Sequence, residues 1–449
     1  MTKKRVAVYT LGCKVNQYES SSLAWLFQER GYRVVDFAEE ADVYIVNTCT
    51  VTHLGDRKSR QLIRRAAKAN PHAFVAVTGC YAQVSPGEIM KIPGVDLVVG
   101  TRDKAALVDL VERAVNERTP VNAVSAYVDG DQFEEMSVQS IQDRVRAFLK
   151  IQDGCSNYCT YCIVPYARGP LRSRQPDRTI DAARHMVAAG YKEIVLTGIC
   201  IGAYGSGLEQ DITLAGLMQS LLEIPGLQRL RLSSIEPHDI TLELVEVMSS
   251  SEIFCRHLHL PLQSGSEEIL RRMGRRYTAW EYLRLVDVLR ENMPGLGLTT
   301  DVMVGFPGES EEYFQNTFDL VNRIGFSGLH VFKYSPRRET PAAGYDRQVG
   351  PALKDERSRK LIRLGKKLAA QFASSHLGRN LSVLVEQPAP GADGFLEGHT
   401  DNYIKVVFPG QAALVGQVVP VQTEKLQETI LEGKIIGQQN EGFNSGYVE

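Results

Sequence analysis

Three cysteines that lie close together in the sequence place the strongest constraint on this chain. Cys155, Cys159 and Cys162 fall within eight positions, directly after the stretch 144–152, which predicts a β-strand. A structural zinc site closes with four protein ligands, so three neighbouring thiols leave one coordination position free. A four-iron cluster held by three thiolates likewise keeps one iron open to an external ligand. The spacing therefore predicts a metal centre with one open position, and a zinc site with a distant fourth ligand is the alternative.

The segment that begins at this strand repeats one pattern. Stretches that predict strands alternate with amphipathic stretches that predict helices. The expected strands are 144–152, 193–199, 229–235, 256–262, 296–305 and 328–334, and the expected helices are 177–190, 240–249, 266–273, 278–291 and 309–323. Six such units predict a partial, TIM-like (β/α)6 barrel, with the cysteine loop directly after its first strand.

The first hundred residues show the same alternation and predict an open parallel sheet covered by helices on both faces. The expected strands are 5–10, 42–47, 73–79 and 95–100. Cys13, Cys49 and Cys80 each follow one of the first three strands, in short polar or glycine-containing loops. Because the carboxyl ends of parallel strands share one edge of the sheet, we expect these thiols to converge there. The alternative is three cysteines buried separately.

The sequence pattern changes beyond the barrel. A basic helix is followed by short β runs, which predict a small five-stranded barrel of the kind that handles single-stranded nucleic acid. The expected fold class is therefore α/β with a small all-β domain at the end. The expected parts are an N-terminal α/β domain at 1–120, a linker at 121–143, the (β/α)6 barrel at 144–350, a basic linker helix at 351–376, the β-barrel at 377–440 and a tail at 441–449.

Composition limits the environment and the partners of the chain. Its 449 residues carry a net charge of −2, so an anionic partner must be bound by local basic patches. No apolar run reaches the roughly 18 residues of a membrane-spanning helix, and the N-terminal stretch turns polar too early for a signal peptide. We therefore expect a cytoplasmic protein without a membrane partner, whose eight cysteines bind metal or do redox work rather than form disulfides.

Sequence segments from both ends and from the middle of the chain carry a family pattern. They are TLGCKVNQYES, VNTCTVT, TGCYAQ, DGCSNYCTYCIVPYARGPLRSR, HLHLPLQSGSEEILRRMGRRYT, TTDVMVGFPGE and the β-rich region from about 378 to 440. These segments resemble the methylthiotransferases of the radical S-adenosylmethionine (SAM) superfamily, and the last region resembles that family's TRAM domain. Within the family, GCKVNQYE and NTCTVT are most similar to the branch that acts on N6-threonylcarbamoyladenosine. They are less similar to the isopentenyladenosine branch, and least similar to the branch that modifies a ribosomal-protein aspartate.

The resemblance implies two [4Fe-4S] clusters. Cys155, Cys159 and Cys162 would bind the cluster whose open iron holds SAM, and the cysteines after the first three N-terminal strands would bind an auxiliary cluster. The implied reaction places a methylthio group on carbon 2 of the modified adenosine at position 37 of tRNA, next to the anticodon. It consumes two equivalents of SAM per turnover and needs a reductant, such as flavodoxin or ferredoxin, and a sulfur donor.

Residues at the carboxyl ends of the barrel strands are candidates for SAM contacts, because barrels of this kind carry their sites at that end. Thr197 and Gly198 end the second strand, where the resemblance implies binding of the SAM amino group. The full set of candidates is Tyr161, Thr197, Gly198, Ser233, Ser234, Glu236 and Gln263. For each of them, loop packing or ordinary turn chemistry is the alternative.

Binding of tRNA requires a positive surface, because phosphate contacts supply much of the affinity for nucleic acid. From residue 376 onward there are four Lys and Arg residues and nine Asp and Glu residues, so the small barrel is acidic and can bind RNA only through a local face. The candidate substrate contacts are Asn16, Asn47, Arg57, Arg60, Arg168, Arg172, Tyr403 and Lys405. For the two asparagines, capping of their own turns is the alternative.

Other interpretations remain open at this stage. Cys200 and Cys255 are expected to pack as small apolar side chains, with a ligand or redox role for Cys200 as the alternative. His257 and His259 alternate along one strand and are expected in the barrel interior. Within the family, the target is alternatively isopentenyladenosine in tRNA or a ribosomal-protein side chain. Outside it, the alternative is a non-catalytic iron–sulfur protein that binds RNA.

Overall fold

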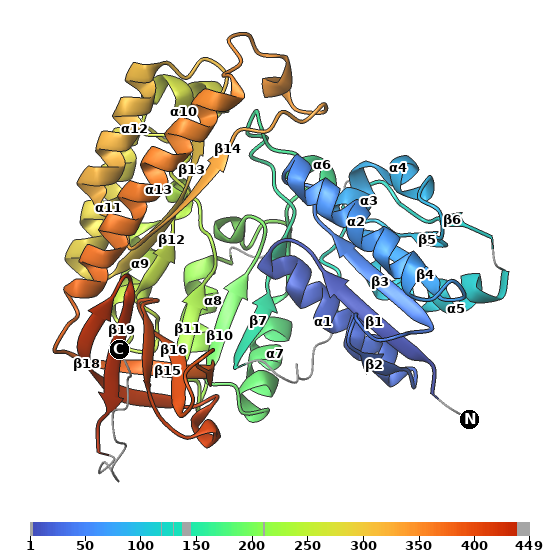
Figure 1. Ribbon diagram of the computed structural model, residues 1–449, viewed down its shortest axis with the longest axis horizontal. Helices are drawn as coiled ribbons and strands as arrows, with labels where there is room; N and C mark the ends of the chain where they lie inside the picture. Colours follow the sequence, from blue (N-terminus) through green and yellow to red (C-terminus); the bar gives the residue numbers. More distant parts are fainter. Residues whose placement is uncertain (1–2, 118, 129, 137–144, 210–211, 438–449) are drawn as a thin grey trace.

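The computed structural model describes residues 3–117, 119–128, 130–136, 145–209 and 212–437. The expected tail at 441–449 and the end of the expected linker, at 137–143, lie outside the described residues. Figure 1 shows an N-terminal α/β domain in blue beside a larger strand-and-helix domain, with a small β-barrel in red at the base of the latter. The predicted fold class is confirmed. Of the helices in the described part of the chain, none is long and apolar enough to cross a membrane.

The N-terminal domain is built on a parallel sheet whose described strands lie in the order β2-β1-β3-β4-β5-β6. The strands are β1 (Arg5–Thr10), β2 (Arg33–Val35), β3 (Val43–Thr48), β4 (Phe74–Gly79), β5 (Leu97–Val98) and β6 (Val121–Asn122). The helices are α1 (Lys14–Glu29), α2 (His53–Ala69), α3 (Cys80–Val84), α4 (Pro86–Met90) and α5 (Leu107–Glu117). One hydrophobic core joins the sheet to α1 and α5, and a second joins its other face to α2, α3 and α4. The sheet is therefore covered on both faces, as expected.

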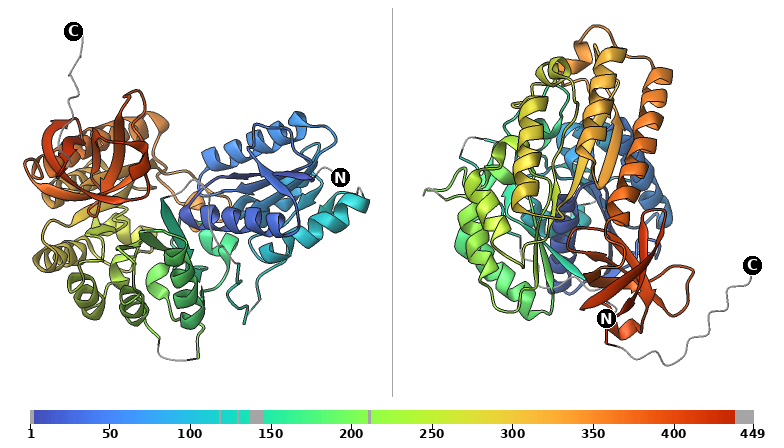
Figure 2. Two further views of the ribbon diagram at one scale, coloured as in Figure 1. Left: turned by 90° about the horizontal axis from the view of Figure 1, so that it is seen from below. Right: turned by 90° about the vertical axis from the view of Figure 1, so that its left-hand side faces the viewer.

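The larger domain carries six described parallel strands with helices on their outer side (Figure 2). The strands are β7 (Arg146–Lys150), β10 (Glu193–Thr197), β11 (Arg229–Leu232), β12 (His257–His259), β13 (Gly297–Val304) and β14 (Gly328–Lys333). The main helices are α7 (Pro176–Ala188), α8 (Leu214–Leu222), α9 (Leu242–Ser249), α10 (Glu267–Met273), α11 (Ala279–Asn292) and α12 (Glu311–Ile324). Two sheets, β7-β10-β11 and β12-β13-β14, are joined by single bridges such as Ser234–His259, so the barrel is partial.

The two faces of the barrel strands differ in polarity. In β10, Ile194 and Leu196 belong to the hydrophobic core shared with the helices. Because side chains alternate along a strand, Glu193, Val195 and Thr197 point to the opposite side, which we call the inner face. The same alternation along the other strands gives the inner face many polar and charged residues, and it is this face that the N-terminal domain and the small barrel approach.

The C-terminal part begins with α13 (Pro351–Ser374), which packs beside β14 and leads into the small barrel. Five strands close on themselves in the order β15-β16-β17-β19-β18, as predicted for this region. They are β15 (Asn380–Pro388), β16 (Phe395–Thr400), β17 (Lys405–Pro409), β18 (Val418–Gln427) and β19 (Ile430–Ile435). Closure of the sheet removes unpaired strand edges.

Candidate functional site

The first set of thiols lies at the carboxyl edge of the N-terminal sheet. The neighbouring strands β1, β3 and β4 are each followed by one cysteine, Cys13, Cys49 and Cys80 respectively. The loops are tightly packed, since a Cβ on Gly12, whose φ is +107°, would lie 3.0 Å from the Cβ of Cys49. Glycine is required there both by this space and by the left-handed backbone. Cys49 also interacts electrostatically with Cys80 and Cys13, so three separate loops bring their thiols near one another.

Asn16 and Asn47 hold these loops in place. The Asn16 amide donates to the backbone carbonyls of Leu11 at 2.7 Å and Thr48 at 3.0 Å, which joins the first two cysteine loops. The Asn47 amide donates to the Asn16 carbonyl at 3.0 Å. Both side chains are buried, with at most 1% of their surface exposed. These hydrogen bonds support the alternative that the asparagines hold their own loops, while the Oδ1 of Asn47 has no partner among the described residues, so a contact with substrate stays a prediction.

Arg168 reaches the first set of thiols from the barrel domain, where it ends the short helix α6 (Val164–Arg168). Its Nε donates to the Sγ of Cys80 at 3.3 Å, and its Nη2 donates to the Oδ1 of Asn16 at 2.5 Å. The side chain is fully buried and forms an ion pair with Glu19 of α1 at 2.5 Å. A fixed positive charge therefore lies against a sulfur atom that carries negative charge when it is a metal ligand.

The ion pairs around Arg168 contain more positive than negative charge. Lys150 Nζ lies 2.9 Å from Glu19 and 2.6 Å from Asp153, and all three side chains are buried. Within the described residues, the cations are Lys104, Lys150, Arg168 and Arg172, and the carboxylates are Glu19, Asp153 and the partly buried Glu134. Four cations thus meet three carboxylates in a buried region, where unbalanced charge is costly. Thiolates that hold an iron–sulfur cluster beside this region would balance the excess, so the residues present fit such a cluster.

Arg168 and Arg172 were expected to present positive charge to RNA phosphates, and the structure corrects this. Arg168 has no exposed surface, and Arg172 is 6% exposed. The Arg172 guanidinium lies 4.5 Å over the ring of Tyr127 and donates to the carbonyl of Arg168 at 3.0 Å. Both arginines are buried because Glu19 and Asp153 are buried carboxylates that need cationic partners.

The second set of thiols, Cys155, Cys159 and Cys162, lies in the loop between β8 (Gln152–Asp153) and α6. The Cys162 amide donates to the Cys159 carbonyl at 2.9 Å, which tightens the loop around its cysteines. Gly154 has a φ of +78°, and a Cβ there would lie 1.8 Å from the carbonyl oxygen of Pro170. The backbone on either side of the loop therefore approaches so closely that only glycine fits before Cys155.

Arg275 donates a hydrogen bond to the second set of thiols, as Arg168 does to the first. Its Nη1 donates to the Sγ of Cys159 at 3.3 Å, its side chain is 4% exposed, and it is ion-paired with Glu236. Each set therefore has one sulfur that accepts a hydrogen bond from a buried arginine. The sequence analysis did not single out this role, because an arginine 116 residues away from Cys159 gives no local signal.

Several of the buried thiols need a metal to become thiolates at neutral pH. Burial raises the pKa of Cys49 and of Cys162 to about 12. Burial also raises the pKa of Cys13. Its side chain is accessible to solvent, but the surrounding protein still disfavours the charged thiolate. Since cysteine binds metal as the thiolate, loading of these sites must release protons.

Cys200 and Cys255 differ in their surroundings. Cys255 is completely buried in the protein. Cys200 is buried against the second set of thiols, where its hydrogen bond lowers the pKa of Cys155 to about 7. It also accepts from the Asn157 amide at 3.7 Å. Cys255 packs as a small apolar side chain, whereas Cys200 contacts Cys155 of the second set directly.

Two of the candidate SAM contacts have features that suit a ligand site. The hydroxyl of Ser233 is buried and has no hydrogen-bond partner among the described residues. Gln263 has a φ of +63°, which is unusual for a residue with a Cβ. Its backbone N–H donates to the backbone carbonyl of Asp301, and its backbone carbonyl accepts from the backbone N–H of Met303, both at 2.8 Å. Strand β13 therefore holds this conformation. Strained backbone conformations of this kind are concentrated at ligand-binding sites.

The remaining SAM candidates are placed as follows. Thr197 is buried at the end of β10. A Cβ on Gly198 would lie 3.0 Å from the Oε1 of Gln152, so this backbone runs close to the loop that begins the cysteine segment. The ring of Tyr161 packs edge-on against Phe306. Ser234 is exposed, and the carboxylate of Glu236 is already paired with Arg275.

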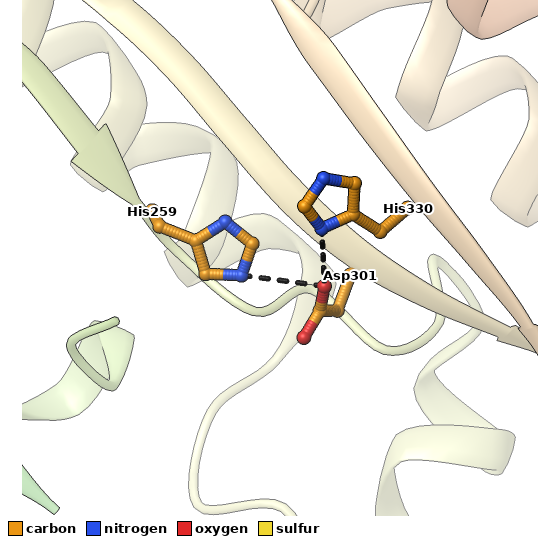
Figure 3. A group of neighbouring side chains, drawn as sticks. All are labelled: His259, Asp301 and His330. Carbon is orange, nitrogen blue, oxygen red and sulfur yellow. Dashed lines mark ion pairs between the residues drawn. The ribbon is translucent and has the colours of Figure 1, made fainter. Parts of the chain in front are cut away.

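A cluster of His259, Asp301 and His330 lies on the inner face of β12, β13 and β14 (Figure 3). The Oδ1 of Asp301 is 3.3 Å from the Nε2 of His259 and 3.3 Å from the Nδ1 of His330. Although burial opposes ionisation, hydrogen bonds from the two imidazoles lower the pKa of Asp301 to about 2. The hydrogen bond to Asp301 raises the pKa of His330. His259 was expected in the barrel interior. The other two were missed, although the alternation of β13 places Asp301 on the inner face.

Tyr403 and Lys405 were expected to contact RNA, and the structure gives them other partners. The ring of Tyr403 stacks against His257 at 4.7 Å and against His399 at 4.9 Å. The Nζ of Lys405 pairs with Glu397 at 2.6 Å. Tyr403 joins the small barrel to the inner face of the larger one, and Lys405 is paired within its own domain, but both side chains stay partly exposed, so their contact with RNA stays a prediction.

The junction of the two barrels also contains the buried carboxylate of Glu193. Its oxygens lie 2.8 Å from Arg231 Nε, 3.0 Å from Arg146 Nε and 3.5 Å from Arg229 Nη1. Although burial opposes ionisation, Arg231 and Arg146 lower the pKa of Glu193 to about 2. Arg231 and Arg229 also donate to carbonyls of the small barrel. The ion pairs of Glu193 therefore fix the arginines that hold the two barrels together.

Replacement of Glu193 with glutamine is expected to change the pH dependence of stability. The pKa of Glu193 is about 2 in the folded protein, below its ordinary value of 4.5. The charged form therefore contributes stability that is present above the unfolded pKa and is lost as the pH falls towards the folded pKa. The difference in free energy of unfolding between the wild type and Glu193→Gln should shrink from pH 7 to about pH 3, as measured by guanidinium denaturation. A constant difference would contradict the assignment.

Basic side chains that are available to phosphates lie on α2. Arg57 is exposed there, whereas Arg60 is partly buried and donates to the Tyr81 hydroxyl at 2.9 Å. The exposed cations of this helix are Arg57, Lys58, Arg64, Arg65 and Lys68. The helix begins shortly after Cys49, so Arg57 and Lys58, in its first turns, are the members of this surface that lie nearest to the first set of thiols in the sequence.

Comparisons with known proteins agree with this geometry. The family models "Uncharacterized protein family UPF0004", "Radical SAM superfamily" and "TRAM domain" match residues 5–100, 149–321 and 375–436 respectively. The threonylcarbamoyladenosine tRNA methylthiotransferase MtaB of Bacillus subtilis (strain 168) is 47% identical, over 96% of each chain. The MtaB of Aquifex aeolicus is 40% identical, over 93% of this chain and 99% of its own.

More distant matches extend this comparison. The tRNA-2-methylthio-N(6)-dimethylallyladenosine synthase of Moorella thermoacetica is 38% identical, over 97% of this chain and 99% of its own. Among solved structures, the radical S-adenosylmethionine methyltransferase TsrM of Kitasatospora setae, with cobalamin and a [4Fe-4S] cluster bound, superposes with a TM-score of 0.58. The match covers 84% of this chain and 96% of that chain at 16% identity, so it shows a shared fold.

Proposed function

Because the chain belongs to the radical-SAM methylthiotransferase family, we propose that it inserts a methylthio group at carbon 2 of N6-threonylcarbamoyladenosine at position 37 of tRNA. The observation that carries this proposal is the presence of two separate sets of three thiols, joined by Arg168, which contacts one set and ends the helix α6 that follows the loop of the other. The names of the relatives at 47% and 40% identity support the choice of this base.

The proposed reaction needs groups that side chains do not supply, because the hydrogen on carbon 2 of adenine is not acidic at neutral pH. Two [4Fe-4S] clusters and SAM, of which two equivalents are used per turnover, supply the radical and sulfur-transfer chemistry. We assign the SAM-binding cluster to Cys155, Cys159 and Cys162. The auxiliary cluster is assigned to the thiols that follow β1, β3 and β4.

The chain's own residues position these groups. Arg168 and Arg275 donate to one sulfur of each set and offset its negative charge. The unpartnered hydroxyl of Ser233 and the constrained backbone at Gln263 lie at the carboxyl ends of barrel strands, and we assign them, with Thr197, to SAM. Asn16 and Asn47 keep the loops of the first set at a fixed separation.

The proposed substrate is bound outside the thiol region as well. The exposed cations of α2, Arg57 among them, are suited to phosphates of the anticodon arm. The reaction further requires a reductant such as flavodoxin or ferredoxin and a sulfur donor. We place it in the cytoplasm, where tRNA is modified.

Loss of the gene is expected to remove one modified nucleoside from cellular tRNA. In a deletion strain, 2-methylthio-N6-threonylcarbamoyladenosine should disappear and N6-threonylcarbamoyladenosine should accumulate. The wild-type gene should restore the methylthio group, and Cys159→Ala should not. The measurement is mass spectrometry of nucleosides from total tRNA.

Two other outcomes of this experiment would reject the proposal. Loss of the methylthio group from isopentenyladenosine would move the chain to the other tRNA branch, whose relative is 38% identical. An unchanged nucleoside profile would exclude tRNA as the target and point to a protein substrate or to a non-catalytic role.

A further inference from the structure

Among the residues that the structure describes, Lys14 is a cation without a partner, and it lies at the junction of the two larger domains. It follows Cys13 directly and begins α1, which packs against β7 of the barrel, and its charge acts on barrel residues. Its electrostatic neighbours there are Arg146, Arg231, Glu193, His257 and His330. Within the described residues, its half-buried side chain forms neither a hydrogen bond nor an ion pair. A partly desolvated ammonium of this kind calls for an anion from elsewhere.

The carboxylates near Lys14 are already occupied. Glu193 is shared by Arg146, Arg229 and Arg231, and the carboxylate of Glu386 pairs with Arg146 and with His399. Asp301 accepts from two imidazoles (Figure 3). The inner face around Lys14 therefore carries an excess of positive charge that the described side chains do not balance, and an anionic ligand would bind there with little competition.

We propose that Lys14 binds the carboxylate of an amino-acid substituent on N6 of the substrate adenine. This inference rests on the proposed function, because the threonylcarbamoyl group carries a carboxylate and adenine itself carries none. A dimethylallyl substituent has no charge, so it would leave the ammonium unpaired and desolvated. Lys14 thus favours the acidic substituent over the apolar one by a charge-assisted contact.

The position of Lys14 also suits the chemistry at carbon 2. Lys14 is the immediate neighbour of Cys13 and interacts electrostatically with it, so a substituent held by its ammonium lies near the first set of thiols. On the adenine ring, N6 is attached to carbon 6, and a single ring nitrogen, N1, separates carbon 6 from carbon 2. Anchoring the substituent therefore fixes the rotation of the ring in its own plane, and with it the direction in which carbon 2 points.

His330 supplies a second contact for the same substituent. Its Nδ1 faces Asp301, which orients the ring, and its side chain is 63% exposed (Figure 3). The other ring nitrogen, Nε2, has no hydrogen-bond partner among the described residues, so it is available to a carboxylate or hydroxyl. Lys14 and His330 come from different domains, so a substituent that bridges them requires both domains in place.

The test compares two RNAs that differ in one group. Anticodon stem-loops carry at position 37 either N6-threonylcarbamoyladenosine or its carboxamide, which has the same shape without the charge. Their dissociation constants are measured with the cluster-loaded full-length wild type, Lys14→Gln and Lys14→Arg. The wild type should bind the carboxylate roughly 10- to 100-fold more tightly than the amide. Lys14→Gln should bind both alike, and Lys14→Arg should retain the preference. Any general effect of a substitution cancels in the ratio of the two constants.

Controls separate this inference from the proposed function. Lys4→Gln, at an exposed position before β1, should keep the wild-type ratio. An unchanged ratio in Lys14→Gln, or a wild type that does not distinguish the two RNAs, would overturn the role of Lys14 while leaving the reaction intact. If the wild type fails to methylthiolate the threonylcarbamoyl stem-loop in a parallel assay, the proposed function is what fails.

Discussion

Replacement of Cys49 with alanine is expected to abolish methylthio transfer, while the protein still cleaves SAM under reducing conditions. The substitution removes one of the three thiols at the edge of the N-terminal sheet, whereas the thiols of the barrel loop remain. Cys49 lies near Cys13 and Cys80 and belongs to a different domain from the second set. The measurement is the yield of 5′-deoxyadenosine and of methylthiolated nucleoside from the same anaerobic reaction with tRNA.

Two further cysteine variants serve as controls for this prediction. Cys159→Ala should lose both products, because it removes a ligand of the SAM-binding cluster. Cys255→Ala changes a fully buried cysteine that contacts neither set, so it should give both products at wild-type yield. If Cys49→Ala loses SAM cleavage together with transfer, the division of work between the two sets is wrong.

Replacement of Glu19 with alanine is expected to lower the free energy of unfolding by about 3–5 kcal/mol, the usual cost of breaking a buried ion pair. Glu19 has no exposed surface, and its carboxylate contacts Lys104, Lys150 and Arg168. Its removal leaves buried cations without enough negative charge and frees the arginine that reaches Cys80. Guanidinium denaturation of the two proteins measures the effect.

An exposed ion pair provides the matched comparison for Glu19. Asp109 pairs with Arg30 at 2.5 Å, but its side chain is 53% exposed. Asp109→Ala should therefore cost only about 0–1 kcal/mol. Equal and small losses for both variants would contradict a tightly packed ionic junction between the two domains.

The expected secondary structure is largely correct, because the period of apolar residues that marks a strand or a helix is visible in the local sequence. The stretch 5–10 forms β1 as expected, and the strands before Cys49 and Cys80 are also present. The edge strands β2 and β6, of three and two residues, were missed, because segments so short show no period of their own. The cysteine positions followed from a general rule, since loops after neighbouring parallel strands meet at one edge.

The surroundings of the cysteines were less predictable, because they depend on partners that are distant in sequence. Arg168 looked like a surface cation, but it meets Glu19, which is 149 residues away. Tyr403 looked like an RNA-stacking residue, but it stacks on His257 from another domain. The sequence does not reveal the roles of Lys14, Asp301 and His330, because the residues that they interact with belong to other elements of the fold. Such roles appear only when the domains are assembled.

The central claim, that the chain holds two iron–sulfur clusters through two sets of three thiols, is tested most directly by iron content. After anaerobic reconstitution, the wild type should bind about eight iron atoms per chain, four for each cluster. The variant with alanine at Cys13, Cys49 and Cys80 should bind about four, with the spectrum of a single cluster. A wild type with only about four iron atoms, or a triple variant that still binds about eight, would contradict the account.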